Sequence, residues 1–350
     1  MLPPFADRLI RWYEHHRRDL PWRKTRDPYK IWLSEIILQQ TRVAQGLSYY
    51  QRFVEHFPDV HALAAATEEE VLNLWQGLGY YSRARNLHYT AKEVAGRGGV
   101  FPPDAAGLRE LKGVGPYTAA AIAGFAYGEA VPVVDGNVYR VLARHRGIEV
   151  DIASPAAYRT FEAAARCLLP PEHPAAFNQA IMELGARQCV PLDPKCLFCP
   201  VQDDCHAFAT GQQSRLPIKS AKKPPRPRYL HYLVPQDPDG GLWLRRRTGR
   251  GIWQGLYDFP LEEADRPLDE ATLRDRPTVR TLREAGAEWA ALSPRYEHIL
   301  THQRLFVHFH DFTAPVALIR ATFPELTRAT PPHWDDYPVP VLIRKYLNDR

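Results

Sequence analysis

A short proline-rich segment, Leu216–Arg228, divides the sequence into two parts with different periodicities. It contains four prolines, five basic residues and no acidic residue. Proline lacks a backbone N–H and fixes φ, so such a segment continues neither a helix nor a central strand. We therefore predict a semi-rigid linker at residues 216–228, between a domain at residues 1–215 and a domain at residues 229–350. The linker can lie along a phosphate backbone, and a merely solvated connector is the alternative.

The residues before the linker show the spacing of amphipathic helices. In Phe5–His16, the side chains of Leu9, Trp12 and Tyr13 lie on one face. Further helices are expected over residues 29–43, 49–56, 68–76, 83–95 and 155–168. No stretch alternates like a strand over any length, so the sequence predicts an all-α domain here.

The residues after the linker show the patterns of both strands and helices. Strands are expected at Tyr229–Val234, Leu242–Arg246 and Arg304–Phe312, and helices at Thr278–Ala285 and Val339–Leu347. This mixture predicts a small α+β domain, so the chain as a whole is expected to be a multidomain protein.

The net charge of +5 lies almost wholly in the linker, because the flanking parts carry only +1 and −1. Bulk charge therefore does not establish nucleic-acid binding by the folded parts, and that case depends on motifs. No segment approaches the apolar length of a membrane span, and the N-terminus lacks the pattern of a signal peptide. We expect a soluble, intracellular protein.

The stretch Leu111–Asn137 contains a turn that could bind an anion. Gly113 and Gly115 precede a helix that opens with Pro116, and glycines there leave backbone N–H groups uncovered. There is no Walker lysine and no preceding strand, so a nucleotide P-loop is a poor fit. A helix–hairpin–helix that grips one DNA phosphate fits better, and an ordinary turn is the alternative.

Four cysteines fall within seventeen residues, in a C-x6-C-x2-C-x5-C pattern: Cys189, Cys196, Cys199 and Cys205. In an intracellular chain such clustering favours metal binding over disulfides. Because only one C-x2-C pair is present, the spacing favours an iron–sulfur cluster over zinc. We expect the cluster to shape a loop at residues 189–205. Cys167 is expected to be a core residue.

Glu35 lies among apolar neighbours, including Trp32, Ile36 and Leu38. A carboxyl group in that setting is desolvated, which raises its pKa and suits it to donate a proton near neutral pH. A buried salt bridge to an arginine is the alternative.

Asp135 has the opposite setting, because it precedes a helix that begins near Asn137. A helix N-terminus favours the ionised carboxylate, although such an aspartate is usually only a cap. One protonated acid and one carboxylate together could cleave a glycosidic bond, with the second stabilising an oxocarbenium-like sugar.

Together, these and other motifs make the chain resemble a MutY-type adenine DNA glycosylase. This family belongs to the helix–hairpin–helix superfamily, which includes endonuclease III, and carries a Nudix-like C-terminal domain. The resemblance is carried by LPWR, WLSEIILQQT, LWQGLGYYSRARNL, LKGVGPYTA, VVDGNVYRVLAR, FNQAIMELGA and the four cysteines.

The resemblance implies a base-excision repair enzyme that removes adenine mispaired with 8-oxoguanine or guanine in duplex DNA and leaves an abasic site. It also implies one [4Fe-4S] cluster and a monomer in the cytoplasm, associated with the nucleoid in a bacterium. The sequence leaves open whether the linker contacts replication or repair proteins.

The resemblance also implies a role for each residue that matches a position of the family's motifs. Glu35 resembles the general acid that protonates adenine at N7, and Asp135 the carboxylate that stabilises the sugar cation. Two further positions are catalytic: Asn137 matches the asparagine that neighbours this carboxylate, and Tyr117 a tyrosine beside the reacting sugar. The remaining positions are Trp22, Arg23 and Gln179 in the adenine pocket, Gln40 and Tyr80 as wedges, and Gly113 and Gly115 on the DNA backbone. Lesion contacts fall on Thr301 and His302, where Leu300 replaces an aromatic residue.

The position of Tyr117 separates two related activities. Bifunctional relatives of the endonuclease III type carry a lysine there, and a tyrosine offers no amine for a Schiff base. Tyr139 likewise stands where some relatives have a lysine. We therefore expect a monofunctional glycosylase, with the bifunctional glycosylase/lyase as the main alternative. A non-catalytic iron–sulfur protein that binds DNA, and a Nudix hydrolase, are further alternatives, and LREAGAEW lacks the acidic run that such a hydrolase needs.

Overall fold

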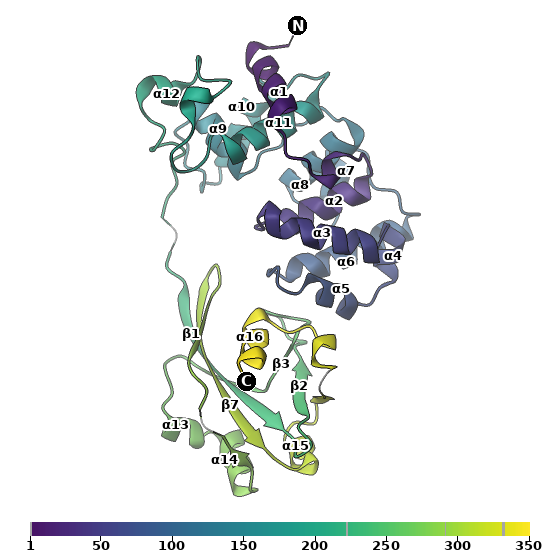
Figure 1. Ribbon diagram of the computed structural model, residues 1–350, viewed down its shortest axis with the longest axis vertical. Coiled ribbons are helices and arrows are strands. Elements are labelled where there is room, and N and C mark those ends of the chain that lie inside the picture. Colours follow the sequence, from purple (N-terminus) through teal and green to yellow (C-terminus); the bar gives the residue numbers. More distant parts are fainter. Residues whose placement is uncertain (1, 222, 291, 331–332) are drawn as a thin grey trace. The chain divides into compact units, whose positions relative to one another are not determined.

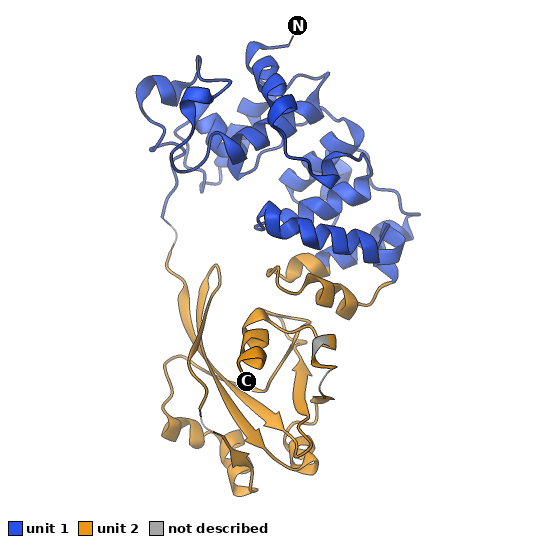
Figure 2. Cartoon of the chain, viewed as in Figure 1, with its two compact units in different colours: residues 1–65, 86–221 blue, residues 66–85, 222–350 orange. Residues whose placement is uncertain are grey.

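Figure 1 shows the computed structural model of the chain, in which residues 2–221, 223–290, 292–330 and 333–350 are described. The chain divides into two compact units (Figure 2). One contains residues 1–65 and 86–221, and the other contains residues 66–85 and 222–350. Residues 66–85 therefore group with the C-terminal part of the chain.

The first unit is built from helices, as predicted. They are α1 (Pro4–His16), η1 (Pro21–Arg23), α2 (Pro28–Leu38), α3 (Val43–His56), α4 (Val60–Ala65), α6 (Ser82–Gly96, beginning in the second unit), α7 (Ala105–Arg109), α8 (Pro116–Ile122), η2 (Ala123–Tyr127), α9 (Gly136–Arg146), α10 (Ala157–Arg166), α11 (Pro174–Arg187), η3 (Cys196–Phe198) and α12 (His206–Thr210). None of the described helices combines the length and apolar character that crossing a membrane requires.

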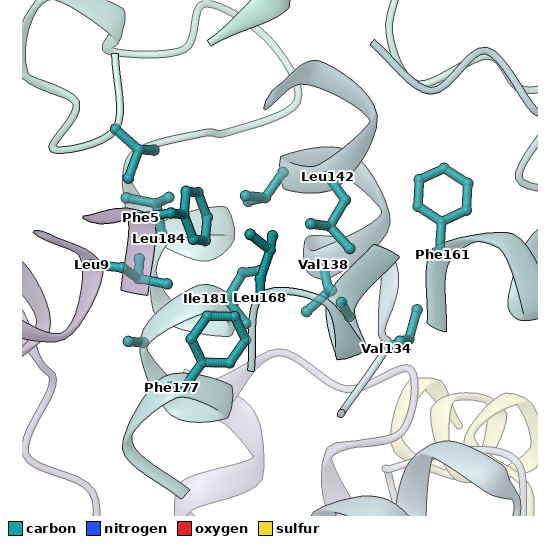
Figure 3. Close-up of a cluster of buried hydrophobic side chains, with 14 of the residues drawn as sticks. Phe5, Leu9, Val134, Val138, Leu142, Phe161, Leu168, Phe177, Ile181 and Leu184 are labelled. Atoms are coloured by element: carbon teal, nitrogen blue, oxygen red, sulfur yellow. The ribbon is translucent and has the colours of Figure 1, made fainter. Parts of the chain in front are cut away.

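An apolar core forms where α1, α9, α10 and α11 meet (Figure 3). Helix α11 contributes Phe177, Ile181 and Leu184, whose spacing of four and three residues places them on one face. Helix α9 contributes Val138 and Leu142 from its own buried face. This packing fixes the N-terminus of α9, which carries Asp135.

The helix predicted over residues 29–43 is wrong in its second half. Helix α2 ends at Leu38, and α3 begins at Val43, earlier than the predicted start at Tyr49. Gln40 has a φ of 56°, a left-handed conformation that interrupts a right-handed helix.

The second unit combines α5 (Glu68–Trp75) with a sheet and further helices, in agreement with the α+β prediction. Its other elements are β1 (Arg226–Gln236), β2 (Leu242–Arg246), β3 (Tyr257–Asp258), β4 (Leu261–Ala264), α13 (Glu270–Arg274), α14 (Pro277–Glu284), β5 (Glu288–Trp289), β6 (Tyr296–Ile299), β7 (Gln303–Thr313), α15 (Val316–Thr322), β8 (Thr327–Ala329), η4 (His333–Asp336) and α16 (Val341–Asp349).

The strand order is β3-β2-β1-β7-β5, with β4 paired to β1, β6 to β7 and β8 to β2. Strands β1 and β7 run parallel, from the pair Arg226–Gln303 to the pair Gln236–Thr313. Figure 1 shows these two long strands side by side. Their apolar side chains help to form the core of the unit.

The extended segment between the units is shorter than the predicted linker 216–228. Leu216 is buried in the core of the first unit, and Ile218 O accepts a hydrogen bond of 3.0 Å from Ile152 N. Strand β1 begins at Arg226, so both ends of the predicted linker belong to folded parts. Lys222, also in that prediction, lies outside the described residues.

Candidate active site

A cavity of about 640 Å³ lies in the first unit, between η1, α2, the start of α8, α9 and α11. Seven of the residues predicted to form the catalytic centre or the adenine pocket line it: Trp22, Arg23, Glu35, Tyr117, Asp135, Asn137 and Gln179. Residues separated by more than 150 positions in the sequence therefore share one cavity.

Glu35 points into this cavity from α2 and is only 6% exposed. Its Oε2 accepts a hydrogen bond of 2.8 Å from Tyr117 Oη. Burial raises the pKa of Glu35 to about 7, and the nearby negative charge of Asp135 adds to the rise. The hydrogen bond from Tyr117 and the charge of Arg23 oppose it. The carboxyl group is thus poised to hold a proton near neutral pH, as predicted.

Asp135 is the N-cap of α9, as predicted. Its Oδ1 accepts hydrogen bonds from the backbone N–H groups of Asn137 and Val138, at 2.9 and 2.8 Å. Its Oδ2 accepts a third, at 2.7 Å, from Asn137 Nδ2. Three donors aimed at one carboxyl group favour its anionic form.

The pKa of Asp135 is shifted upward, whereas its place at a helix N-terminus predicts a downward shift. Burial raises its pKa above the ordinary value, while the hydrogen bonds and the charge of Arg140 hold the rise back. The sequence reveals the helix N-terminus but not the depth of burial, which comes from packing around the cavity. Glu35 and Asp135 still differ clearly, because only Asp135 has backbone N–H donors.

A buried ion-pair network centred on Glu183 holds two arginines that line the cavity, Arg18 and Arg23. The sequence analysis did not predict a role for Glu183. Glu183 is fully buried and accepts hydrogen bonds from Arg18 Nη2 at 2.6 Å and Arg23 Nη2 at 2.7 Å. Burial works to raise its pKa, but the two arginines outweigh that and lower it to about 2. Glu183 lies one helical turn after Gln179 on α11. This spacing places both side chains on one face of the helix, and it is the feature of the sequence that could have indicated Glu183.

The remaining predicted pocket residues are held in place by aromatic neighbours. Gln179 Oε1 accepts a hydrogen bond of 2.8 Å from Tyr13 Oη. The buried ring of Trp22 meets the ring of Tyr50 edge-on, with 5.1 Å between centroids. These contacts orient the side chains of Gln179 and Trp22 in the wall of the cavity.

The four clustered cysteines line a second, much smaller cavity of about 30 Å³. All four are free thiols. Among the described residues, no set of three or more His, Cys, Asp or Glu side chains is arranged around a single ion. Cys167 is exposed, so its prediction as a core residue is wrong.

Two arginines on α9 tie the cysteine loop to the helix that carries Asp135. Arg140 donates to Cys189 O at 2.6 Å and to Asn137 Oδ1 at 2.9 Å. Arg144 is buried and donates to the carbonyl groups of Val190, Pro191 and Leu216, at 2.7, 2.9 and 2.9 Å. Helix α9 thus joins the loop with the cysteines to the cavity that contains Asp135.

Comparison with known proteins shows which family the chain belongs to. A family model described as HhH-GPD superfamily base excision DNA repair protein matches residues 33–167, and a NUDIX domain model matches residues 231–349. An adenine DNA glycosylase of Buchnera aphidicola (subspecies Baizongia pistaciae) is 35% identical over 260 residues, and the match covers 73% of each protein. The chain belongs to the adenine DNA glycosylase family.

Other relatives support this family assignment. The adenine DNA glycosylase of Arabidopsis thaliana is 38% identical over 350 residues, and the match covers 86% of this chain. The chain spans only 55% of the length of that plant protein. A solved structure of a thermostable thymine-DNA glycosylase matches with a TM-score of 0.55 and 29% identity, covering 59% of this chain and 95% of that one. The helical architecture is therefore shared with other DNA glycosylases.

In this member of the family, the predicted hairpin lies between α7 and α8. Gly113 has a φ of +81°, and a Cβ added there would stand 2.9 Å from the side chain of Asn86. Gly115 is the N-cap of α8, and no atom lies within 4 Å of where its Cβ would be. One glycine is therefore required by packing, and the other leaves the turn open to solvent.

The residues predicted as wedges and lesion contacts are not among those that line the cavity of Glu35 and Asp135. Gln40 is exposed in the turn between α2 and α3. In the second unit, Tyr80 is 52% exposed, with a φ of 48°, and its hydroxyl shares a hydrogen bond of 2.7 Å with Thr301 Oγ1. Tyr80, Thr301 and His302 line one cavity of about 470 Å³. The structure thus brings one of the two predicted wedges, Tyr80, together with the predicted lesion contacts, and does not do so for Gln40.

Proposed function

We propose that this protein hydrolyses the N-glycosidic bond of adenine mispaired with 8-oxoguanine or guanine in duplex DNA. The product would be an abasic site. The observation that carries the proposal is the pair Glu35 and Asp135 in one cavity, one with a pKa near 7 and the other with three hydrogen-bond donors. Relatives named adenine DNA glycosylases support adenine as the base that is removed.

In the proposed reaction, Glu35 gives its proton to N7 of adenine. The bond between C1′ of the sugar and N9 then breaks, and its electron pair stays with the purine, which leaves as neutral adenine. Asp135 stabilises the positive charge that develops on the sugar. A water molecule adds to C1′ and loses a proton, which restores the acid form of Glu35 through solvent. The sugar is left with a hydroxyl group.

The base would occupy the part of the cavity lined by Trp22, Arg23 and Gln179. A base inside a duplex cannot reach a buried acid, so adenine must leave the stack. The ring of Trp22 offers a flat apolar surface, and Gln179 offers an amide for the edge of the base. Glu183 holds Arg23 in its position through a hydrogen bond of 2.7 Å.

The chemistry of the cavity favours a monofunctional enzyme. No lysine lines the cavity among the described residues, and the hydroxyl of Tyr117 donates a hydrogen bond to Glu35. A lyase of the endonuclease III type needs an amine that forms a Schiff base with C1′. Water is therefore the proposed nucleophile, and the bifunctional glycosylase/lyase is the second candidate.

Contacts with the duplex are proposed for three further sets of residues. Gly113 and Gly115 would present backbone N–H groups to a phosphate. Gln40 and Tyr80 would enter the stack, where wedging side chains fill the space that a flipped base leaves. Thr301 and His302 would contact the base opposite adenine.

We propose that Cys189, Cys196, Cys199 and Cys205 hold one [4Fe-4S] cluster. The four cysteine side chains line one cavity against the core of the first unit, so they converge on one place, as the ligands of a cluster bound by thiolates must. Bound there, the cluster would cross-link the loop at residues 189–205. Iron and acid-labile sulfide measured in the purified protein should be close to four each per chain. Stoichiometric zinc without sulfide would contradict this assignment.

The activity is tested with three duplexes that hold adenine opposite 8-oxoguanine, guanine or thymine. Products are separated before and after treatment with alkali, which breaks the strand at abasic sites. We expect cleavage of the first two duplexes after alkali, and little of the third.

Strand breakage without alkali, or efficient trapping of an enzyme–DNA adduct by borohydride, would favour the lyase instead. Absence of adenine release from the duplexes with 8-oxoguanine and guanine would overturn the proposed function.

A further inference from the structure

Tyr13 does not line the catalytic cavity, but it contacts two residues that do. It belongs to α1 and is only 6% exposed, within the core of the first unit. Its hydroxyl forms a hydrogen bond of 2.8 Å with Gln179 Oε1, and the guanidinium of Arg23 stands 5.5 Å from the centre of its ring. Gln179 and Arg23 are both in the wall of the cavity. One buried side chain therefore supports two pocket residues.

The hydroxyl of Tyr13 is the donor in its hydrogen bond with Gln179. Burial raises the pKa of Tyr13, and the charge of Arg23 opposes the rise, so the phenol keeps its proton at neutral pH. A buried O–H group without an acceptor is costly, and among the described residues Gln179 Oε1 is the acceptor within reach. If the amide donated instead, the phenol proton would have no acceptor. The oxygen of the amide is therefore fixed toward Tyr13.

The direction of this hydrogen bond determines what Gln179 offers to a ligand. A side-chain amide carries its oxygen and its nitrogen on opposite sides of one planar carbon, so Nε2 points away from Tyr13. No residue that the structure describes forms a hydrogen bond with Nε2. The end of the amide that is left for a ligand in the cavity is therefore its donor end.

Purine bases differ in how they meet such a donor. N1 of adenine carries no proton and accepts a hydrogen bond, whereas N1 of hypoxanthine carries a proton and donates one. Two N–H groups that face each other lose a hydrogen bond and repel each other. A wall that offers a donor to N1 therefore favours adenine over hypoxanthine.

We propose that Tyr13 is a positioning residue for base specificity, which holds the amide of Gln179 so that Nε2 donates a hydrogen bond to N1 of the flipped adenine. The inference rests on the proposed function, because it names the atom of the base that this wall recognises. N1 and N7 lie on different rings of the purine, so this contact leaves N7 accessible to Glu35.

The test compares the release of adenine and of hypoxanthine, each placed opposite 8-oxoguanine in the same duplex. Single-turnover rate constants are measured at saturating full-length protein, and the readout is the ratio of the adenine rate to the hypoxanthine rate. A general loss of stability would not change this ratio. Tyr13→Phe keeps the ring beside Arg23 but frees the amide to turn, so that Oε1 can accept from N1–H of hypoxanthine. The ratio should fall by about fivefold, the factor expected for one hydrogen bond.

Two further variants isolate the contact between Tyr13 and Gln179. Gln179→Leu removes the amide and should also lower the ratio, and Tyr13→Phe should have no further effect in that background. Tyr29→Phe is the matched control, because the hydroxyl of this buried residue donates a hydrogen bond of 2.6 Å to Phe57 O, outside the cavity. Tyr29→Phe should leave the ratio unchanged. Thermal melting of each variant confirms that it folds.

An unchanged ratio in Tyr13→Phe, an equal fall in Tyr29→Phe, or a further fall in the double variant would overturn the proposal. Failure of the unsubstituted protein to release adenine would instead count against the proposed function. The inference is then tested without catalysis, by calorimetric titration of the protein with the free bases. Adenine should bind more tightly than hypoxanthine, and Tyr13→Phe should reduce this preference. The same preference in both proteins would overturn the positioning role.

Discussion

The protonation of Glu35 has a measurable effect on stability as well as on the proposed chemistry. Its pKa is about 7 in the folded protein and near 4.5 in an unfolded chain, so folding favours the neutral form. Ionised Glu35 therefore destabilises the fold. This cost is absent below about pH 4.5, grows as pH rises toward 7, and is constant above that.

We predict that Glu35→Gln is more stable than the unsubstituted protein at pH 8, by up to about 3 kcal/mol, and similar to it near pH 4.5. The amide keeps the shape of the side chain but carries no charge. Chemical unfolding at the two pH values measures the difference.

Glu183→Gln is the control, because the expected change in its stability at pH 8 is opposite to that of Glu35→Gln. The pKa of Glu183 is lowered to about 2, so its charged form stabilises the fold above the unfolded pKa, and this contribution is lost as pH falls toward 2. Glu183→Gln should therefore be less stable at pH 8. A gain in stability for both variants at pH 8 would contradict this account of the two carboxyl groups.

At Asp135, the structural and chemical roles can be separated. Asparagine is as good an N-cap as aspartate, so Asp135→Asn should fold normally. It lacks the negative charge that stabilises the sugar cation, so adenine release should fall by at least about 100-fold. Single-turnover assays on the duplex with 8-oxoguanine measure this. Asp104→Asn, at the N-cap of α7, should keep full activity.

The sequence predicts some of these environments and not others. Glu35 is surrounded by apolar residues of its own helix, and Asp135 is followed by the start of its own helix, so both settings are local. The network of Glu183 with Arg18 and Arg23 forms only because α11 meets the loop around η1, far away in the sequence. The local sequence shows only that Glu183 lies one helical turn after Gln179, and it does not reveal the two distant arginines.

Helix α9 joins two features of the first unit. Its N-terminus holds Asp135, and its later turns hold the loop with the cysteines through Arg140 and Arg144. The buried guanidinium of Arg144 donates hydrogen bonds to three carbonyl oxygens at once. The ammonium of a lysine cannot place its donors in the same geometry. The loop thus depends on one side chain of this helix.

We predict that Arg144→Lys destabilises the first unit by about 2 kcal/mol, because buried carbonyl groups lose their donors. Thermal melting and the iron content of the purified protein would both report the loss. Arg146→Lys, at an exposed position on the same helix, should change neither. Equal effects of the two substitutions would show that the hydrogen bonds of Arg144 are unimportant.

Most of the elements follow from periodicity, because their apolar residues face a core along one side. The break after Leu38 does not, since the residues around Gln40 are compatible with a helix and only tertiary packing selects the left-handed conformation there. The start of β1 at Arg226 was missed for a similar reason. Its pairing with Gln303 of β7 is a contact between distant residues.

At the scale of the whole molecule, residues 66–85 group with the C-terminal residues rather than with the rest of the helical part. Asn73 Nδ2 donates to Asp336 O at 2.6 Å, and Arg246 pairs with Glu68 at 3.0 Å. The linker composition indicates two domains, but it cannot reveal that an earlier segment joins the second. Tyr80 and Thr301 meet for this reason.

We predict that Thr301→Ala reduces the preference for adenine opposite 8-oxoguanine over adenine opposite guanine. The substitution removes the hydroxyl that bonds to Tyr80, and one hydrogen bond of about 1 kcal/mol corresponds to about fivefold. The rate on the duplex with guanine should stay the same. Paired single-turnover assays measure both. Thr322→Ala, whose hydroxyl bonds within α15, should not alter the preference.

The proposed reaction depends on a protonated Glu35 beside the carboxylate of Asp135. The most direct test is the single-turnover rate of adenine release from a duplex with 8-oxoguanine, measured from pH 5.5 to 9. We predict a constant rate below pH 7 and a decline of about tenfold per pH unit above it, as Glu35 loses its proton. Glu35→Gln should be slow at every pH and lack this decline. A Glu35→Gln variant that retains the rate, or declines above pH 7 as the unsubstituted protein does, would contradict the account.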